Sequence, residues 1–210
     1  MKNLSQLNAE HLDFFMEIEN IGASHAATAL STLLGRPVKV RVPKVKFLEF
    51  AEVNAVLGGP ENLIVSLLVE MSGDLNGFIL LAQDALEAKK MSAAIVRSMG
   101  MEIEDTGELL TGLQESALNE VANILSGAYL NALSELTGLS TSKSVPKMVI
   151  DMAGAIMNLP AAIYGAYGDV VLLMETEFVD TGGDGNLNGH FLMVPDVESF
   201  HIMLSSMGID

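Results

Sequence analysis

Two polar triplets have the residue types and the spacing that could do chemistry. In each triplet an Asp or Ser comes four residues before a Glu, and an Asn follows the Glu by three: Asp13, Glu17 and Asn20, and Ser116, Glu120 and Asn123. Positions i, i+4 and i+7 share one face of a helix. Asn is a poor residue for a helix interior, but its amide can both donate to and accept from a water molecule. Each triplet therefore predicts a polar face that could orient water.

The simpler interpretation is that both triplets are merely solvated helix faces. Their repetition argues against it. A Pro in the sequence VPK follows each Asn by 23 residues, at Pro43 and Pro146. Glu, Lys, Gln and Arg would all serve a solvated helix better than Asn. We expect the two prolines to shape a neighbouring loop rather than to touch a substrate.

The triplets are part of a longer internal repeat. Both halves close on the sequence SMG, at 98–100 and 206–208, and an offset of 103 residues aligns further identical positions. The aligned pairs are Asn20/Asn123, Ile21/Ile124, Ala29/Ala132, Leu30/Leu133, Leu33/Leu136, Gly35/Gly138, Val42/Val145, Pro43/Pro146 and Lys44/Lys147. We expect one domain, residues 1–210, built from repeats at about 8–100 and 107–208 and arranged about a pseudo-twofold axis.

Apolar residues at three- and four-residue steps predict long helices at about 8–34 and 107–137, the second stopped by Gly138. Further helices are expected at about 84–99, 149–162 and 197–207. Alternating patterns predict strands in VKVRVPKVKFLEF, interrupted at Pro43, and in DVVLLMETEFVD and GHFLMV. LIVSLLVEM and GFILLA flank a probable turn at residues 72–76, which predicts a hairpin. The fold class is α/β with α+β layers: two long motif helices and further helices on a largely antiparallel sheet.

The amino-acid composition excludes several classes of protein and of partner. Half of the residues are apolar and 18% are charged, which argues against disorder. The net charge of −16 argues against nucleic acid and anionic membrane surfaces as partners. The chain has no cysteine, no apolar signal segment near its start and no apolar run long enough for a membrane span. We expect a cytoplasmic protein, and a monomer, because a self-contained duplication removes one reason to dimerise.

Other candidate sites are weaker. The four histidines are scattered without common ligand spacing, so no metal site is expected. The segment TGGDGNLNG is rich in glycine but lacks a Lys-Ser/Thr ending, and a hairpin loop fits it better than a phosphate loop. Glu19 is assigned no role, because its counterpart in the repeat is Ala122.

The doubled pattern Asp/Ser-x3-Glu-x2-Asn-x22-Pro resembles the CheC / CheX / FliY family of bacterial and archaeal chemotaxis phosphatases. The stretches ENIGASHAATAL, ALNEVANILSGAYLNAL and VPKMVIDMAGAI are similar to CheC, which is the nearest match within the family. The resemblance covers nearly the whole chain. It implies a CheC-like fold and a phosphatase, a hydrolase that acts on the phospho-aspartate of a CheY-type response regulator in two-component signalling.

The resemblance also implies roles for single residues. Glu17 and Glu120 would dock onto a Lys of the regulator, and Asn20 and Asn123 would orient the attacking water. Asp13 and Ser116 would support the motif by orienting the Glu or by contacting the regulator. The protein would need no cofactor of its own, since Mg²⁺ would be held by the regulator.

Asp151 is a candidate contact for a second partner. In CheC members that resemble this chain, the corresponding helix binds the receptor deamidase CheD. The alternative is an ordinary first-turn acid favoured by the helix dipole.

Two other functions stay open at this point. The protein could be a non-catalytic adaptor that binds CheD or the regulator and tunes receptor adaptation. It could also be a small-ligand-binding α/β domain outside chemotaxis, which nothing but the core composition supports. Retention of Glu and Asn in both halves favours the enzyme, because an adaptor has no need of an amide inside a helix.

Overall fold

The structure is a computed structural model that describes residues 9–103, 106–164, 171–180, 186–206 and 208. The first half contains, in chain order, α1 (Ala9–Leu34), β1 (Val38–Leu48), α2 (Phe50–Val56), β2 (Leu63–Gly73), β3 (Gly77–Asp84) and α3 (Ala85–Ser98). The second half contains α4 (Gly112–Thr137), β4 (Thr141–Lys143), β5 (Lys147–Met152), α5 (Ala153–Tyr164), β6 (Val171–Asp180), β7 (Asn186–Pro195) and α6 (Val197–Ser206). The two halves thus follow nearly the same order of elements.

A seven-stranded sheet forms the middle of the molecule. Its order is β1-β6-β7-β3-β2-β4, β5 also pairs with β2, and the paired strands are antiparallel. Exchanging β1 with β4 and β5, β2 with β6, and β3 with β7 gives the same strand order read from the opposite edge of the sheet. The register of β1 shifts between Arg41 and Lys44, and the second half breaks at the equivalent place, between β4 and β5.

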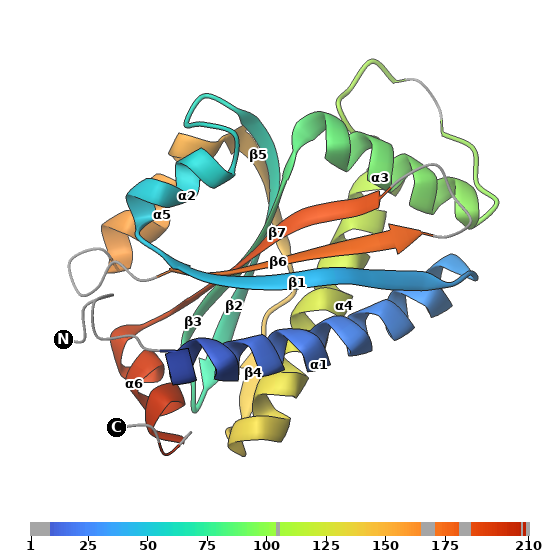
Figure 1. Ribbon diagram of the computed structural model, residues 1–210. Coiled ribbons are helices and arrows are strands. Elements are labelled where there is room, and N and C mark those ends of the chain that lie inside the picture. The colour runs from blue at the N-terminus through green and yellow to red at the C-terminus, as the bar shows by residue number, and fades with distance from the viewer. Residues whose placement is uncertain (1–8, 104–105, 165–170, 181–185, 207, 209–210) are drawn as a thin grey trace.

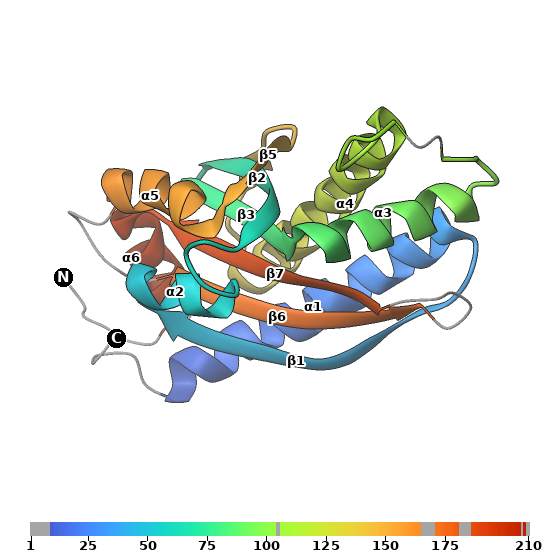
Figure 2. The ribbon, with the colours of Figure 1, turned by 90° about the horizontal axis from the view of Figure 1, so that it is seen from above.

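Both faces of the sheet are covered by helices. Alternate residues of a strand point to opposite faces, so Ile79 and Leu81 of β3 join one core while Leu80 and Ala82 join another. The first core holds residues of α1, α3, α4 and α6, and the second holds residues of α2 and α5. Figure 1 shows α2 and α5 side by side, across the sheet from α1 and α4. In Figure 2, which looks down on the strands, α1 lies behind them.

Most of the expected helices are confirmed, and two of them start later than predicted. α3 is bounded by its caps, Asp84 and Met99, and Gly138 ends α4 in the left-handed conformation that glycine adopts without strain. The predicted start of α4 at residue 107 is wrong. Thr111 caps the helix by accepting a hydrogen bond from the Gln114 backbone, and the Gln114 side chain accepts from the Thr111 backbone. This capping box begins the helix at Gly112.

Other predictions need correction. The helix expected from residue 149 begins at Ala153, because residues 147–152 pair with β2 as strand β5. The short helix α2 was not predicted. Residues 186–189 of the glycine-rich segment belong to β7, while residues 181–185 lie outside the described residues. Among the helices of the described ranges, none is both long and apolar enough to cross a membrane.

Candidate functional site

The first triplet lies on the outer face of α1. Asp13, Glu17 and Asn20 are exposed, whereas Phe15 and Ile18 between them are buried in the core. Within the described ranges, the Asn20 side chain makes no hydrogen bond. The helix therefore presents the amide to solvent on a backbone that the core holds in place.

The second triplet lies in a surface groove along α4. Ser116, Glu120 and Asn123 line this groove, which has a volume of about 600 Å³, together with Pro146 of the segment between β4 and β5. The groove also has an apolar border of exposed side chains, which we call the groove rim: Met99, Met101, Leu113 and Val145. Exposed apolar side chains around a few polar groups are typical of protein-binding surfaces.

Lys143, which the sequence did not single out, contacts the second triplet. Its Nζ donates a hydrogen bond to the backbone oxygen of Asn123 at 3.0 Å and another to the side-chain Oδ1 of the same residue. Partial burial lowers the pKa of Lys143 below its ordinary value, and the negative charge of Glu120 opposes that shift. The two triplets therefore differ in their surroundings.

The two motif helices pack closely against each other. Gly22 of α1 faces the ring of Tyr129 of α4, and a Cβ atom at position 22 would lie only 2.5 Å from Tyr129 Cδ1. A larger residue would therefore force the helices apart. This contact packs α1, which carries the first triplet, directly against α4, which carries the second.

Glu19 occupies this helix interface, which corrects the expectation that it has no role. Its exposure is 0%, and Tyr129 Oη donates a hydrogen bond to its Oε1 at 3.0 Å. Burial raises the pKa of Glu19 to about 8, and the Tyr129 hydrogen bond partly offsets this. Glu19 is thus a structural residue next to the motif, and only its packing reveals it.

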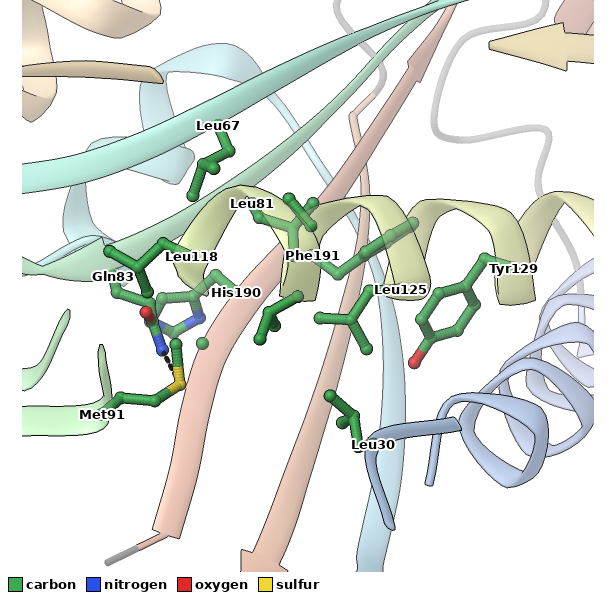
Figure 3. A pocket seen from close by; sticks show the side chains of 13 residues that line it. Leu30, Leu67, Leu81, Gln83, Met91, Leu118, Leu125, Tyr129, His190 and Phe191 are labelled. Carbon is green, nitrogen blue, oxygen red and sulfur yellow. Dashed lines mark hydrogen bonds between the residues drawn. The ribbon is translucent and has the colours of Figure 1, made fainter. Parts of the chain in front are cut away.

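The inner face of α4 lines a small internal cavity. Figure 3 shows Leu118, Leu125 and Tyr129 of α4 beside it, with Gln83 and His190 from the sheet. Its volume of about 40 Å³ is water-sized, and its lining is mainly apolar. Burial lowers the pKa of His190, while the Glu175 carboxylate opposes this. Both triplets lie on outer helix faces, so this cavity does not serve them.

The two prolines have different surroundings. Pro43 lies within β1, where the register shifts between Arg41 and Lys44. Pro146 lies between β4 and β5 and lines the groove beside Asn123. Pro43 therefore lies in a strand and not in the expected loop, whereas Pro146 lies in a short connection between two strands. The roles expected of the two prolines stay predictions.

Asp151 does not lie on a helix, so the helical placement that both interpretations share is wrong, whereas its contact with CheD stays a prediction. It is an exposed residue of β5, paired with Ile64 of β2. Residues 147–152 complete a sheet ladder, which overrides the helical pattern of the sequence. Among the described residues, no group of three or more His, Cys, Asp or Glu side chains is placed to hold a metal ion.

Comparison with known proteins places this geometry in a family. A model of the CheC-like family matches residues 10–47 and 113–150, two segments with the same 103-residue offset as the repeat. The chain is 32% identical over 208 residues to the CheY-P phosphatase CheC of Bacillus subtilis strain 168, a match that covers 99% of each chain.

Solved structures share the fold. FliY of Thermotoga maritima matches with a TM-score of 0.71 and 27% identity over 96% of this chain and 98% of that one. A chain of the CheX–CheY–BeF3–Mg²⁺ complex of Borrelia burgdorferi matches with a TM-score of 0.50 and 17% identity, over 84% of this chain and 96% of that one.

The sheet order and the helices on its two faces define an α+β protein with the fold of FliY and CheX. The chain belongs to the CheC-like family, which confirms the resemblance seen in its sequence.

Proposed function

We propose that this protein is a phosphatase that hydrolyses the aspartyl phosphate of a CheY-type response regulator in chemotaxis signalling. The observation that carries the proposal is the placement of a Glu and an Asn on exposed faces of two helices held by the core. Side chains placed in this way can enter the active site of another protein. The name of the Bacillus subtilis relative, CheY-P phosphatase, supports the same substrate.

In this mechanism Glu17 and Glu120 pair with a lysine of the regulator and set the distance between the proteins. Asn20 and Asn123 then orient a water molecule, accepting from it through Oδ1 and donating through Nδ2. The water oxygen forms a bond to phosphorus as the bond from phosphorus to the aspartate oxygen breaks. The products are inorganic phosphate and the regulator's free aspartate carboxylate, and the water's proton leaves with phosphate or solvent.

Phosphoryl transfer passes through a loose transition state, so catalysis depends mainly on positioning and charge stabilisation. An amide on a rigid helix provides positioning without a shifted pKa. A Mg²⁺ ion held by the regulator would neutralise charge on the phosphoryl oxygens. The proposed role of this chain is therefore to dock the regulator and align the water.

We further infer that the chain is one domain built as an internal repeat with two sites. The equal offset of the two family matches and the exchangeable strand order support this arrangement. Within the same proposal, the protein acts in the cytoplasm. It acts as a monomer, and light scattering of the purified chain would test this oligomeric state.

The decisive experiment removes both amides. We expect the Asn20→Ala/Asn123→Ala double variant to lose stimulated phosphate release from phosphorylated CheY, leaving only the regulator's own rate of hydrolysis. Asn131→Ala removes an exposed amide from α4 outside the triplet and serves as the control. Circular dichroism should show that all the variants remain folded. A wild-type rate in the double variant would refute the proposal and favour a non-catalytic adaptor.

A second surface, on strand β5, has features of a binding site for a partner protein such as the deamidase CheD. The strand β5 pairs with β2 on one side only among the described strands, and it carries the exposed apolar residues Val149, Ile150 and Met152 beside Asp151. An edge strand with exposed apolar side chains is a docking surface for another chain. We propose that CheD binds here.

A charge reversal tests this second surface. We expect Asp151→Lys to weaken CheD binding at least tenfold in a calorimetric titration, since the new charge stands in the middle of the proposed contact. Glu87→Lys reverses an exposed charge on α3 and should leave the affinity unchanged. Equal affinity of the Asp151→Lys variant and the wild type would rule out this surface.

A further inference from the structure

Lys143 is the cation that distinguishes the second triplet from the first. It is the last residue of β4, and its backbone pairs with Met71 of β2. A second contact between these strands joins the Ser72 and Ser142 hydroxyls at 2.8 Å. The sheet therefore holds the base of the lysine side chain, and its position does not depend on a loop.

The path of the Lys143 side chain leads across α4 to Asn123. A Cβ atom at Gly127, one turn after Asn123, would lie 3.5 Å from Lys143 Cε. The alkyl stem thus passes over a helix position without a side chain. At its end, Nζ bridges the backbone oxygen and the side-chain Oδ1 of Asn123.

This contact engages Asn123, one of the two groups that the proposed mechanism uses in the second site. Oδ1 of Asn123 is the atom that would accept a hydrogen bond from the attacking water. The negative charge of Glu120 acts on the same ammonium group, as it would act on a lysine of the regulator. A docking regulator must therefore compete with a cation that the chain already supplies.

Among the side chains that the structure describes, none makes an equivalent contact with the first site. The repeat offset of 103 aligns Lys143 with Val40 and Gly127 with Ser24. Neither residue carries a charge, and the Asn20 side chain makes no hydrogen bond with the part of the chain that the structure describes. At these two positions outside the triplets, only the second half has the lysine and the glycine that form the contact.

We propose that Lys143 makes the second site the weaker of the two, by holding the Asn123 amide oxygen and offsetting the charge of Glu120 until a regulator displaces it. This inference rests on the proposed phosphatase function. Hydrogen bonds and ion pairs of a partly exposed lysine contribute modestly, so their loss should raise kcat/KM of the second site about three- to tenfold.

The experiment isolates the second site with the Asn20→Ala variant. The rate of phosphate release from CheY charged with acetyl phosphate is measured with and without Lys143→Met. Lys147→Met is the matched control, because it removes the same charge four residues further along, where Lys147 pairs with Glu70 at 2.9 Å. Lys143→Arg keeps a cation and should retain the low rate of phosphate release. If any substitution at position 143 raised the rate, Lys143→Arg would raise it as well.

A readout without the regulator separates this inference from the function. The side-chain NH2 signal of Asn123, assigned in nitrogen-15 NMR spectra by its loss in Asn123→Ala, should shift with Lys143→Met and stay in place with Lys147→Met. An unshifted signal would overturn the contact itself.

The kinetic outcomes are also distinct. A higher rate for Asn20→Ala/Lys143→Met than for Asn20→Ala, with no change for Lys147→Met, supports the inference. An equal or lower rate overturns it, and a lower rate would mean that the cation assists catalysis. A wild-type rate in Asn20→Ala/Asn123→Ala would instead refute the phosphatase function, whatever Lys143 does.

Discussion

Replacing Glu19 by Gln should change how the stability of this protein depends on pH. Glu19 is buried between α1 and α4, where Tyr129 donates to Oε1 at 3.0 Å. The second oxygen, Oε2, is buried and has no hydrogen-bond partner among the described residues. Burial is the main reason that the pKa of this carboxyl rises from 4.5 to about 8. Gln keeps the acceptor for Tyr129 and cannot ionise.

The sign of the effect follows from proton binding. Between about pH 4.5 and 8 the folded state keeps the Glu19 proton and the unfolded chain releases it, so the free energy of unfolding falls as the pH rises. The stabilisation is fully present below pH 4.5 and is lost as the pH rises through about 8. One proton corresponds to a slope of about 1.4 kcal/mol per pH unit. The wild type should therefore lose roughly 3 kcal/mol relative to Glu19→Gln between about pH 5 and pH 8.

Urea unfolding followed by circular dichroism at several pH values measures this difference. The slope is the readout, because the new amide also places an NH2 group where Oε2 was, at a cost that does not depend on pH. Glu135→Gln removes an exposed carboxylate from α4, the helix that packs against α1, and controls for the loss of one charge. Parallel curves of unfolding free energy against pH for the wild type and Glu19→Gln would refute the reasoning.

Two further changes test the packing of the motif helices and the groove rim. Gly22→Ala should destabilise the fold by about 1–3 kcal/mol in urea unfolding, because the new Cβ atom would meet the Tyr129 ring. Gly112→Ala is the control, because a Cβ atom at position 112 would meet open space. Equal stabilities of Gly22→Ala and the wild type would contradict the packing argument. Val145→Asp, at a groove-rim position that is 77% exposed, should raise KM for phosphorylated CheY about tenfold in a chain whose first site has been inactivated. Val149→Asp on β5 controls for the added charge, and an unchanged KM for Val145→Asp would remove the groove rim from the docking surface.

Much of the candidate site could be predicted from local spacing. The i, i+4 and i+7 positions determine which residues share a helix face, and this is independent of the rest of the fold. The structure accordingly places Glu17, Asn20, Glu120 and Asn123 on exposed faces of α1 and α4. The hairpin of β2 and β3 was also readable, because its turn residues lie between two apolar runs.

Local patterns failed where distant segments decide the outcome. Residues 149–152 have a helical pattern but form a strand, because they pair with residues 63–66 of β2. The short helix α2 is set by a capping box between Glu49 and Glu52, and it packs on the core that it shares with α5. Such pairings depend on which surfaces meet in the folded chain.

The two motif helices, the residues on their outer faces and the resemblance to the CheC family could thus all be read from the amino-acid sequence. Only the tertiary structure decided that Glu19 is buried against Tyr129 and that Lys143 reaches Asn123. The physical reason is that helical periodicity is a property of neighbouring residues, whereas these two contacts join positions 110 and 20 residues apart. Their geometry exists only after α1, α4 and the sheet have packed together.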